Sequence, residues 1–310
     1  MSSPVFSVII ATHNRAELLP RAIKSVLGQT FGDFELIVID NGSTDDTKAV
    51  IESISDKRIR YAANPNPTGS CDVPRNIGIR MAWGEFVAFL DDDDTWYPNR
   101  LERVRIAFDA NPDAACVCHD ELRRVNGKPA GVIHSGPWSE DMLERLLYEG
   151  NRFSSCGTTI RTDAIRRAGG FDESNELSEV ADYDLWIRMA KDGIRAFFIP
   201  GVLGEFNLTG SNWSSVSPAF AAKQAMMIQS HILRYEKKPL PRISRRGLWR
   251  LSQLYFITGR NYLKAKCFGK GIYFILMSLV FIARRPFILI DLCRKIREKM
   301  HDARMPPSEF

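Results

Sequence analysis

The sequence lacks the cysteine patterns of disulfide and zinc frameworks. Its six cysteines are scattered along 310 residues, with no C-x-x-C pair and no histidines at zinc-site spacing. We therefore exclude a disulfide scaffold or a structural zinc site of the usual kind. The cysteines are expected to be reduced and mostly buried, as in proteins of a reducing compartment.

Secretion signals and long apolar runs are also missing. The first four residues carry no basic side chain, and the short apolar run 5–11 leads directly into Thr12, His13 and Asn14. This run predicts a first strand rather than a signal peptide. The longest uncharged stretch of the C-terminal region, Gly271 to Ala283, has 13 residues, and a membrane-spanning helix needs about 20. A cytoplasmic location is expected.

Two common phosphate-binding motifs are absent. No G-x-G-x-x-G follows the first predicted strand, and no G-x-x-x-x-G-K-[ST] occurs anywhere. Neither a Rossmann dinucleotide site nor a P-loop is therefore supported. A nucleotidyltransferase is disfavoured because the basic glycine-rich phosphate loop typical of such enzymes is missing.

Charge is distributed unevenly between the two ends of the chain. Residues 1–222 carry 23 Lys and Arg against 32 Asp and Glu, a net charge of −9, whereas residues 223–310 carry 19 against 5, a net charge of +14. A basic segment of this kind meets nucleic acid, phosphates or an anionic membrane surface. Its many Phe, Ile and Leu residues argue against nucleic acid.

Short apolar runs alternate with helical patterns in the first half. Residues 6–12, 34–40 and 85–91 are continuous runs of strand length, and residues 16–29 and 45–54 have helical spacing. Asn14 and Ser43 or Thr44 are predicted to cap these helices. The alternation predicts an α/β fold with a mainly parallel sheet and helices on both faces.

Polar residues follow three of the predicted strands. They are Thr12 to Asn14, Asp40 to Ser43, and four consecutive aspartates, Asp91 to Asp94. Ligands bind beyond the carboxyl ends of the strands in such sheets, so these residues mark one rim as a site. Adjacent carboxylates repel by roughly 1 kcal/mol in water and about 4 kcal/mol at an effective dielectric of 20. A bound Mg²⁺ or Mn²⁺ would relieve that repulsion, although an isolated acidic run is usually a solvated turn.

Several motifs in order resemble the family 2 glycosyltransferases of the GT-A fold. The resemblance covers about two thirds of the chain, and it is carried by SVIIATHNR, LIVIDNGSTDDT, PRNIGIRMAWGEFVAFLDDDDTW, GGFDE and DYDLWIRMA. It implies transfer of a sugar from a nucleotide-sugar, usually a UDP-sugar, with inversion. It also implies a nucleotide-sugar-binding site and a D-x-D-like metal element. The residues it assigns to nucleotide-sugar binding are Ala11, Thr12, His13, Asp40, Asn41, Arg75, Asp91 and Asp92.

The resemblance assigns Asp93 as the metal ligand and Asp182 as the catalytic base. Helix geometry separates Asp182 from Asp184: Asp182 falls on one face with Leu185, Trp186 and Met189, whereas Asp184 is rotated by about 200°. An aspartate in the first turn of a helix is also stabilised by the helix dipole, without any catalytic role. Asp94 is expected to be structural. Ser154, Ser155 and Thr158 are candidates for contacts to sugar hydroxyls.

Two positions depart from the family pattern. Ala181 stands where an acidic residue commonly precedes the base, and a histidine common near the segment 205–214 is missing. The second departure leaves the metal shell to Asp93, the diphosphate and water. A catalytically silent nucleotide-sugar-binding or assembly protein is the alternative.

The chain is predicted to divide into a catalytic domain, residues 1–217, and a basic amphipathic helical tail, residues 218–310. Basic amphipathic helices lie in the interface of anionic membranes, and packing of the tail on the domain or on a partner is the alternative. The expected location is the cytoplasmic face of a membrane, where the acceptor would be a saccharide or a polyprenyl-linked saccharide.

Overall fold

The chain forms two compact units in a computed structural model that describes residues 3–208 and 217–283. Unit 1 consists of Met1–Leu146 and Gly150–Ser215, and unit 2 consists of Leu147–Glu149 and Val216–Phe310. The domain boundary predicted from the sequence lies between residues 217 and 218, and the longer segment of unit 2 begins at Val216.

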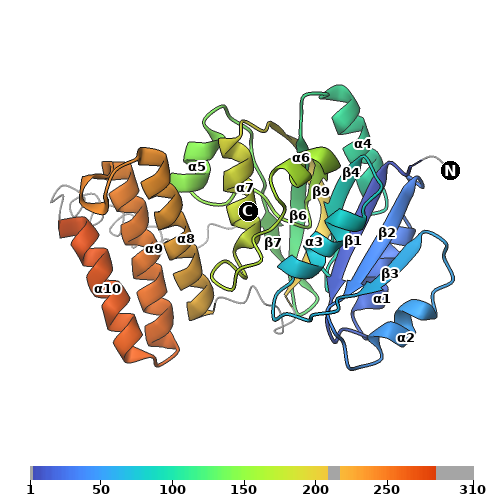
Figure 1. Cartoon of the computed structure of the whole chain (residues 1–310), viewed down its shortest axis with the longest axis horizontal. Helices are drawn as coiled ribbons and strands as arrows, with labels where there is room; N and C mark the ends of the chain where they lie inside the picture. Colours follow the sequence, from blue (N-terminus) through green and yellow to red (C-terminus); the bar gives the residue numbers. More distant parts are fainter. Residues whose placement is uncertain (1–2, 209–216, 284–310) are drawn as a thin grey trace, which may run out of the picture. The chain divides into compact units, whose positions relative to one another are not determined.

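A single mixed sheet forms the centre of unit 1 (Figure 1). Its strands are β1 (Phe6–Thr12), β2 (Phe34–Asp40), β3 (Ile59–Ala63), β4 (Phe86–Phe89), β5 (Thr95–Trp96), β6 (Cys116–Val125), β7 (Lys128–Ile133), β8 (Thr158–Arg161) and β9 (Ala196–Leu208). The strand order is β3-β2-β1-β4-β8-β6-β9-β5, and β7 pairs with β6. Strands β3, β2, β1 and β4 are parallel, and β8 is antiparallel to its neighbours β4 and β6.

The register of the parallel strands brings their polar ends to one rim. Thr12 of β1 pairs with Asp40 of β2, and Ile9 of β1 pairs with Phe89 of β4. Asp91 follows Phe89 by two residues, so it lies level with Ala11, near the end of β1. The side chains of β2 are all buried, which fits its continuous apolar sequence.

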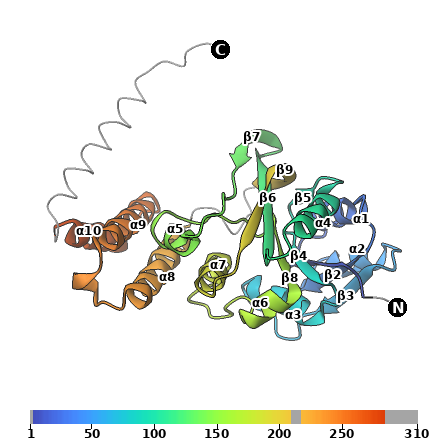
Figure 2. The same ribbon diagram turned by 90° about the horizontal axis from the view of Figure 1, so that it is seen from above.

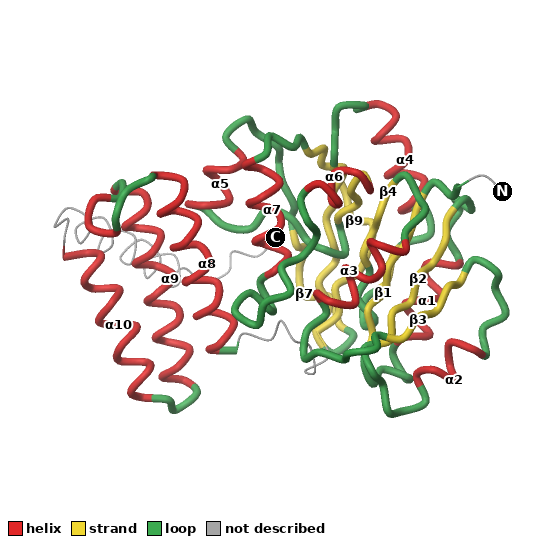
Figure 3. Tube along the Cα trace, viewed as in Figure 1, coloured by secondary structure: helices red, strands yellow, loops and turns green. Residues whose placement is uncertain are grey.

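Helices cover both faces of the sheet (Figures 2 and 3). Those before residue 208 are α1 (Leu19–Leu27), α2 (Thr47–Glu52), α3 (Asp72–Met81), α4 (Arg100–Ala110), α5 (Met142–Tyr148), α6 (Thr162–Arg167) and α7 (Ala181–Lys191). Val8 and Ile10 belong to the core that includes the apolar residues of α1 and α4. Ile9 points to the opposite face, where α3 comes so close that a Cβ on Gly78 would lie 2.5 Å from Ile9 Cγ2.

The helix caps predicted from the sequence are wrong. Helix α1 begins at Leu19, five residues after Asn14, and α2 begins at Thr47, with Asp46 in the capping position. Asn14 has a left-handed backbone, φ 52°, and its Oδ1 accepts a hydrogen bond from Thr44 N at 2.7 Å. Its side chain therefore ties the end of β1 to the loop after β2.

The described part of unit 2 contains three long helices connected by short turns. They are α8 (Pro218–Glu236), α9 (Arg245–Lys264) and α10 (Phe268–Ala283), with a short 3₁₀ helix at Leu240–Arg242. Ser217 caps α8 by accepting a hydrogen bond from Phe220 N, and Ser244 caps α9 by accepting one from Gly247 N. Glu236 holds the turn between them, since its carboxylate accepts from Ser244 Oγ at 2.7 Å.

The helical character predicted for the tail is confirmed as far as Ala283. The predicted break at Arg284, Arg285 and Pro286, the run that follows it, and Cys293 lie outside the described residues. None of the helices in the described part of the chain is long and apolar enough to cross a membrane.

Candidate active site

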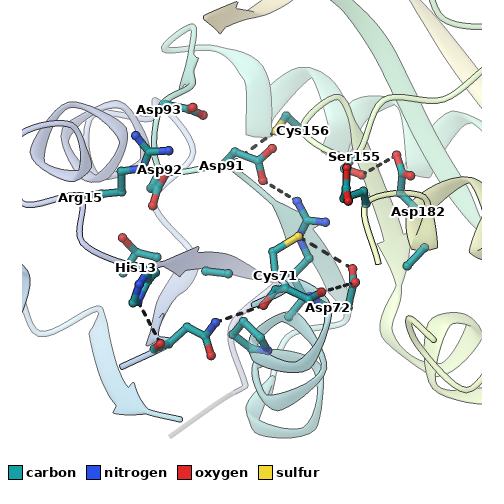
Figure 4. Close-up of a pocket in the computed structure, with 18 of the residues that line it drawn as sticks. His13, Arg15, Cys71, Asp72, Asp91, Asp92, Asp93, Ser155, Cys156 and Asp182 are labelled. Atoms are coloured by element: carbon teal, nitrogen blue, oxygen red, sulfur yellow. Dashed lines mark hydrogen bonds and ion pairs between the residues drawn. The ribbon is translucent and has the colours of Figure 1, made fainter. Parts of the chain in front are cut away.

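A cavity of about 480 Å³ opens at the polar rim of the unit 1 sheet. Figure 4 shows residues from both halves of unit 1 facing it, among them His13, Asp91 and Asp182. The sequence-predicted residues that line it are Ala11, Thr12, His13, Asn41, Arg75, Asp91, Asp92, Asp93 and Asp182. They come from the ends of β1, β2 and β4 and from helices α3 and α7.

Asp40 was predicted to bind the nucleotide but does not line the cavity. Its side chain is buried, with Oδ1 accepting a hydrogen bond from Ser43 N at 2.8 Å and Oδ2 accepting one from Tyr61 OH at 3.2 Å. Asp40 therefore shapes the turn after β2 in this structure.

Asn41 lines the cavity, but its amide already has its full set of hydrogen bonds. Its Nδ2 donates to the carbonyl oxygens of Thr68 and Ser70, and its Oδ1 accepts from Asn64 Nδ2 and Thr68 N. A side-chain amide has two donor hydrogens and two acceptor lone pairs. Asn41 consequently fixes the loop 68–70, which forms part of the cavity wall.

Arg75 and Asp91, which both line the cavity, form an ion pair. Arg75 Nη2 lies 2.5 Å from Asp91 Oδ1, and the guanidinium carbon lies 5.4 Å from the ring centroid of Phe171. Arg75 itself is buried, and nearby acidic groups, including Asp91 and Asp72, raise its pKa well above its usual value despite the opposing effect of burial. A permanent positive charge thus stands among carboxylates.

Asp92 and Asp93 are carboxylates with strongly raised pKa values. Burial raises the pKa of Asp92 to about 6 and that of Asp93 to about 7, and the charge of Asp91 adds to both shifts. Arg15 opposes the shift at Asp92, with its Nε 4.0 Å from Asp92 Oδ1. Arg21 fixes the backbone here by donating to the carbonyl oxygen of Asp93 at 2.7 Å.

Asp94 does not line the cavity and serves the fold, as its sequence position suggested. It is 1% exposed, and its Oδ1 accepts a hydrogen bond from Asn207 N at 2.7 Å, which ties the aspartate run to β9. Asp94, Asp91 and Cys156 bring one ligand atom each within 4.8 Å of one another. Asp93, the predicted metal ligand, is not part of that group.

Asp182 lies in the first turn of α7, at the cavity wall. Its Oδ2 accepts a hydrogen bond from Ser155 Oγ at 3.3 Å, and its Oδ1 accepts one from Tyr183 N at 2.7 Å. Burial raises the pKa of Asp182, and the positive charge of Arg75 opposes that shift. A partly exposed carboxylate with raised pKa is suited to take a proton from a bound hydroxyl.

Asp184, two residues further along α7, faces a different environment. It is 4% exposed and pairs with Arg188 Nε at 2.7 Å, and Arg188 in turn donates to Gly170 O at 2.7 Å. Asp184 therefore braces α7 against the segment before Phe171, and it does not line the cavity.

The structure adds residues that sequence reasoning missed. Arg15, Cys71 and Asp72 line the cavity (Figure 4). Asp72 and Arg75 are three positions apart at the start of α3, a spacing that places two side chains on one helix face, so this signal was present in the sequence.

The three hydroxyl candidates divide between the cavity and the core. Ser154 and Ser155 line the cavity, as expected. Thr158 does not: it is completely buried, and its hydroxyl donates to the carbonyl oxygen of Ser154 at 2.5 Å.

The donor set suits a divalent cation and a diphosphate together. Six carboxylates and two guanidinium groups line the cavity, namely Asp72, Asp91, Asp92, Asp93, Glu179, Asp182, Arg15 and Arg75. Oxygen donors are the ligands that Mg²⁺ and Mn²⁺ prefer. A cation beside Asp93 would counter the repulsion from Asp91 and Asp92 that helps to raise its pKa.

Curated proteins of known family resemble the chain. The putative colanic acid biosynthesis glycosyl transferase WcaA of Escherichia coli K12 is 34% identical over 194 residues, which cover 61% of this chain and 67% of that protein. The GalNAc(5)-diNAcBac-PP-undecaprenol beta-1,3-glucosyltransferase of Campylobacter jejuni is 48% identical over 93 residues, 29% of this chain and 30% of that protein. The chain spans 53–67% of the length of WcaA and of three uncharacterized glycosyltransferases from Rickettsia typhi, Nostoc and Rickettsia prowazekii.

Solved structures share the fold. Staphylococcus aureus TarS 1-349 in complex with UDP-GlcNAc superposes with a TM-score of 0.61 at 18% identity, covering 87% of this chain and 90% of that one. The mannosyltransferase PcManGT of Pyrobaculum calidifontis, in complex with GDP-Man and Mn²⁺, superposes with a TM-score of 0.57 at 17% identity, covering 97% and 81%. The predicted GT-A fold is confirmed by these neighbours.

The sequence profile described as "Glycosyl transferase family 2" matches residues 7–169, which is more than half of the chain. The match includes the ends of β1, β2 and β4 and the aspartate run that line the cavity. The chain belongs to glycosyl transferase family 2.

Proposed function

We propose that the chain transfers a sugar from a nucleotide-sugar, with a UDP-sugar as the first candidate, to a saccharide or polyprenyl-linked acceptor. The transfer would invert the anomeric carbon and serve the synthesis of cell-surface polysaccharide or glycolipid. The observation that carries the proposal is that Asp182 and the run Asp91 to Asp93 line one cavity. The colanic acid and undecaprenol-linked glycan relatives support the acceptor class, and the TarS complex with UDP-GlcNAc supports the donor class.

In the proposed reaction Asp182 acts as general base. Its carboxylate takes the proton of the acceptor hydroxyl while that oxygen forms a bond to the anomeric carbon. The bond from the anomeric carbon to the diphosphate breaks, and its electron pair leaves with the nucleoside diphosphate. Ser155 orients Asp182 through their hydrogen bond, and Arg75 offers positive charge to the leaving group.

Mg²⁺ or Mn²⁺ is the proposed cofactor, with Asp93 as its protein ligand. When bound, such an ion supplies positive charge that stabilises a leaving diphosphate. Thr12, His13 and Asn41 are proposed to border the nucleotide, with Asn41 acting through the loop 68–70.

We further propose that the chain works at the cytoplasmic face of a membrane, with an anionic lipid surface as its partner. The net charge of +14 in residues 223–310 supports this location. So does the relative whose printed name includes an undecaprenol-linked substrate.

A donor panel tests the proposal. The chain would be incubated with UDP-glucose, UDP-galactose, UDP-GlcNAc and GDP-mannose in the presence of Mn²⁺ or of EDTA, and released nucleoside diphosphate would be measured. A membrane lipid extract would then be added as acceptor. We expect one donor to be turned over, more quickly with the lipid extract, and EDTA to abolish the release.

Asp93→Asn should remove the metal-dependent release, whereas the matched change Asp192→Asn, at an exposed position after α7, should not. Equal release by both variants would reject Asp93 as the ligand. No release from any nucleotide-sugar would reject the proposed activity.

A further inference from the structure

Within the described part of unit 2, helix α10 packs on α9 through one of its faces. On that face Phe274 lies 5.6 Å from Tyr255 and 5.5 Å from Tyr262, measured between ring centroids, and Phe281 lies 5.2 Å from Tyr255. Two glycines permit the contact: a Cβ on Gly259 would lie 2.8 Å from Ile275 Cγ1, and one on Gly271 would lie 2.6 Å from Leu263. Figure 1 shows α9 between α8 and α10.

The other face of α10 is both apolar and exposed. Its residues are between 42% and 62% exposed, and they are Phe268, Ile272, Tyr273, Leu276, Leu279 and Val280. Their positions fall within one continuous side of a helix with 3.6 residues per turn. Six large apolar side chains in one continuous strip form a patch of the kind that marks an interaction surface, whereas single exposed apolar residues are common. We call these six residues the outer face of α10.

The positive charge around the outer face favours an anionic partner. Residues 237–283 contain ten Lys and Arg and no Asp or Glu, and Lys264, Lys266 and Lys270 are exposed at the N-terminal end of α10. The sequence places Arg284 and Arg285 directly after its C-terminal end. A second copy of the chain would bring these like charges together, which opposes self-association. Nucleic acid would satisfy the lysines but would leave the apolar strip uncovered.

We infer that the outer face of α10 is the surface by which the chain docks on an anionic lipid bilayer. The six apolar side chains would enter the headgroup and acyl boundary, and Lys264, Lys266 and Lys270 would contact the anionic headgroups. The helix has 16 residues and is therefore about 24 Å long, shorter than the hydrocarbon core, so it lies in the interface and does not cross it. This inference rests on the proposed membrane location and assigns it to particular residues.

Vesicle sedimentation of the full chain tests the inference. We expect the wild type to sediment with vesicles of phosphatidylcholine and phosphatidylglycerol, and to remain in solution with phosphatidylcholine alone. Ile272→Asn combined with Leu276→Asn should reduce the bound fraction at least tenfold. Ile106→Asn, which replaces an equally exposed apolar residue on α4 of unit 1, should leave it unchanged.

Charge is tested separately. Replacing Lys264, Lys266 and Lys270 by Gln should weaken binding and reduce its salt dependence. The matched replacement of three exposed lysines of unit 1, Lys57, Lys128 and Lys191, should have little effect. Thermal unfolding of each variant would identify any that fails to fold.

Three outcomes would overturn the inference. The wild type could stay in solution with anionic vesicles, or the unit 1 variants could lose binding as fully as the α10 variants. Light scattering could also show that the α10 substitutions convert a dimer to a monomer while vesicle binding persists, which would assign the face to a second copy. Donor turnover, measured in parallel, separates the two proposals: a chain that binds vesicles but releases no nucleotide contradicts only the proposed activity.

Discussion

Unit 1 gathers its carboxylates at one partly buried rim, whereas unit 2 spreads cations over an exposed surface beside apolar side chains. The rim is unfavourable for folding, because Asp92, Asp93 and Asp182 are held with raised pKa values. Among the described residues of the cavity wall, the guanidinium groups of Arg75 and Arg15 offset the negative charge. The helices of unit 2 instead gain stability from apolar packing between α9 and α10.

The comparison teaches where each unit is constrained. Strained electrostatics at the rim of unit 1 indicate a site where ligands complete the charge balance. In unit 2 the exposed cations are already solvated, so their positions have little effect on folding stability. Their arrangement can therefore match an extended partner such as a membrane surface. Substitutions at the rim of unit 1 should therefore change the rate of sugar transfer, and substitutions on the exposed surface of unit 2 should change membrane binding.

The largest effect is expected from Asp182→Asn. Without the general base, kcat should fall by roughly 10²–10⁴-fold while donor binding is retained, because the amide cannot accept the hydroxyl proton. Initial rates with the acceptor and a separate donor-binding titration would measure the two quantities.

Asp184→Asn is the matched control, because it changes the same functional group on the same helix. It weakens the pair with Arg188 and should lower the unfolding temperature, with kcat changed only a few-fold. Equal losses of kcat in both variants would show that α7 contributes stability and not a base.

An intermediate effect is expected from Arg75→Met, which leaves Asp91 without its partner. Breaking a fully buried pair costs about 3–5 kcal/mol, but the Asp91 side chain is 38% exposed, so we expect roughly 1–3 kcal/mol. The donor KM should rise as well. Urea unfolding and steady-state kinetics would measure these changes.

Arg105→Met provides the control on the exposed side of α4, where Arg105 pairs with Glu85 and Asp109. Its cost should stay below about 1 kcal/mol, with KM unchanged. If Arg75→Met behaved in the same way, the charge balance assigned to the cavity would be incorrect.

The last prediction concerns the pH dependence of stability. Glu121 of β6 is 1% exposed, and burial raises its pKa to about 7 from an ordinary value of 4.5. Between these values the folded state binds more protons than the unfolded state, so the free energy of unfolding falls as pH rises through this window. The loss nears completion about one pH unit above the folded pKa and amounts to roughly 3 kcal/mol.

Glu121→Gln removes this titration. The variant should match the wild type near pH 5 and exceed it in free energy of unfolding near pH 8, as measured by urea unfolding. Comparing the two proteins cancels the separate titration of buried His119, whose pKa is lowered to about 3. Glu17→Gln, at an exposed site, should show no such difference. If the free energy of unfolding of Glu121→Gln differed from that of the wild type by the same amount at every pH, the titration would not belong to Glu121.

Three parallel strands, β1, β2 and β4, were predictable because each is a continuous, mostly buried apolar run. The fourth, β3, was not predicted, and its residues are only partly buried or exposed. Strands β1 and β2 match the predicted ranges residue for residue, and β4 differs only at its ends. The antiparallel strand β8 was not predicted, since its four residues carry no distinctive pattern and its place between β4 and β6 depends on pairing across long sequence separations.

Part of the candidate site was predictable because it lies at the ends of the predicted parallel strands. Strand ends bring Thr12, Asn41 and Asp91 to one rim, as the βαβ pattern predicts. Side-chain direction was not readable: Asp40 turns to Ser43 and Tyr61, and Thr158 turns to Ser154, because local hydrogen bonds decide their orientation. The prediction that Asn14 caps a helix was wrong because its side chain accepts a hydrogen bond from the loop after β2 instead of from the following helix.

The close approach of α3 to β1 helps to set the width of the cavity. Gly78 sits against Ile9, and Ile9 is 1% exposed and has no room to retreat. Even a methyl group at position 78 would lift the helix away from the sheet, and Asp72 and Arg75 travel with that helix. The width of the cavity therefore depends on the absence of a side chain at Gly78, although Gly78 does not line the cavity.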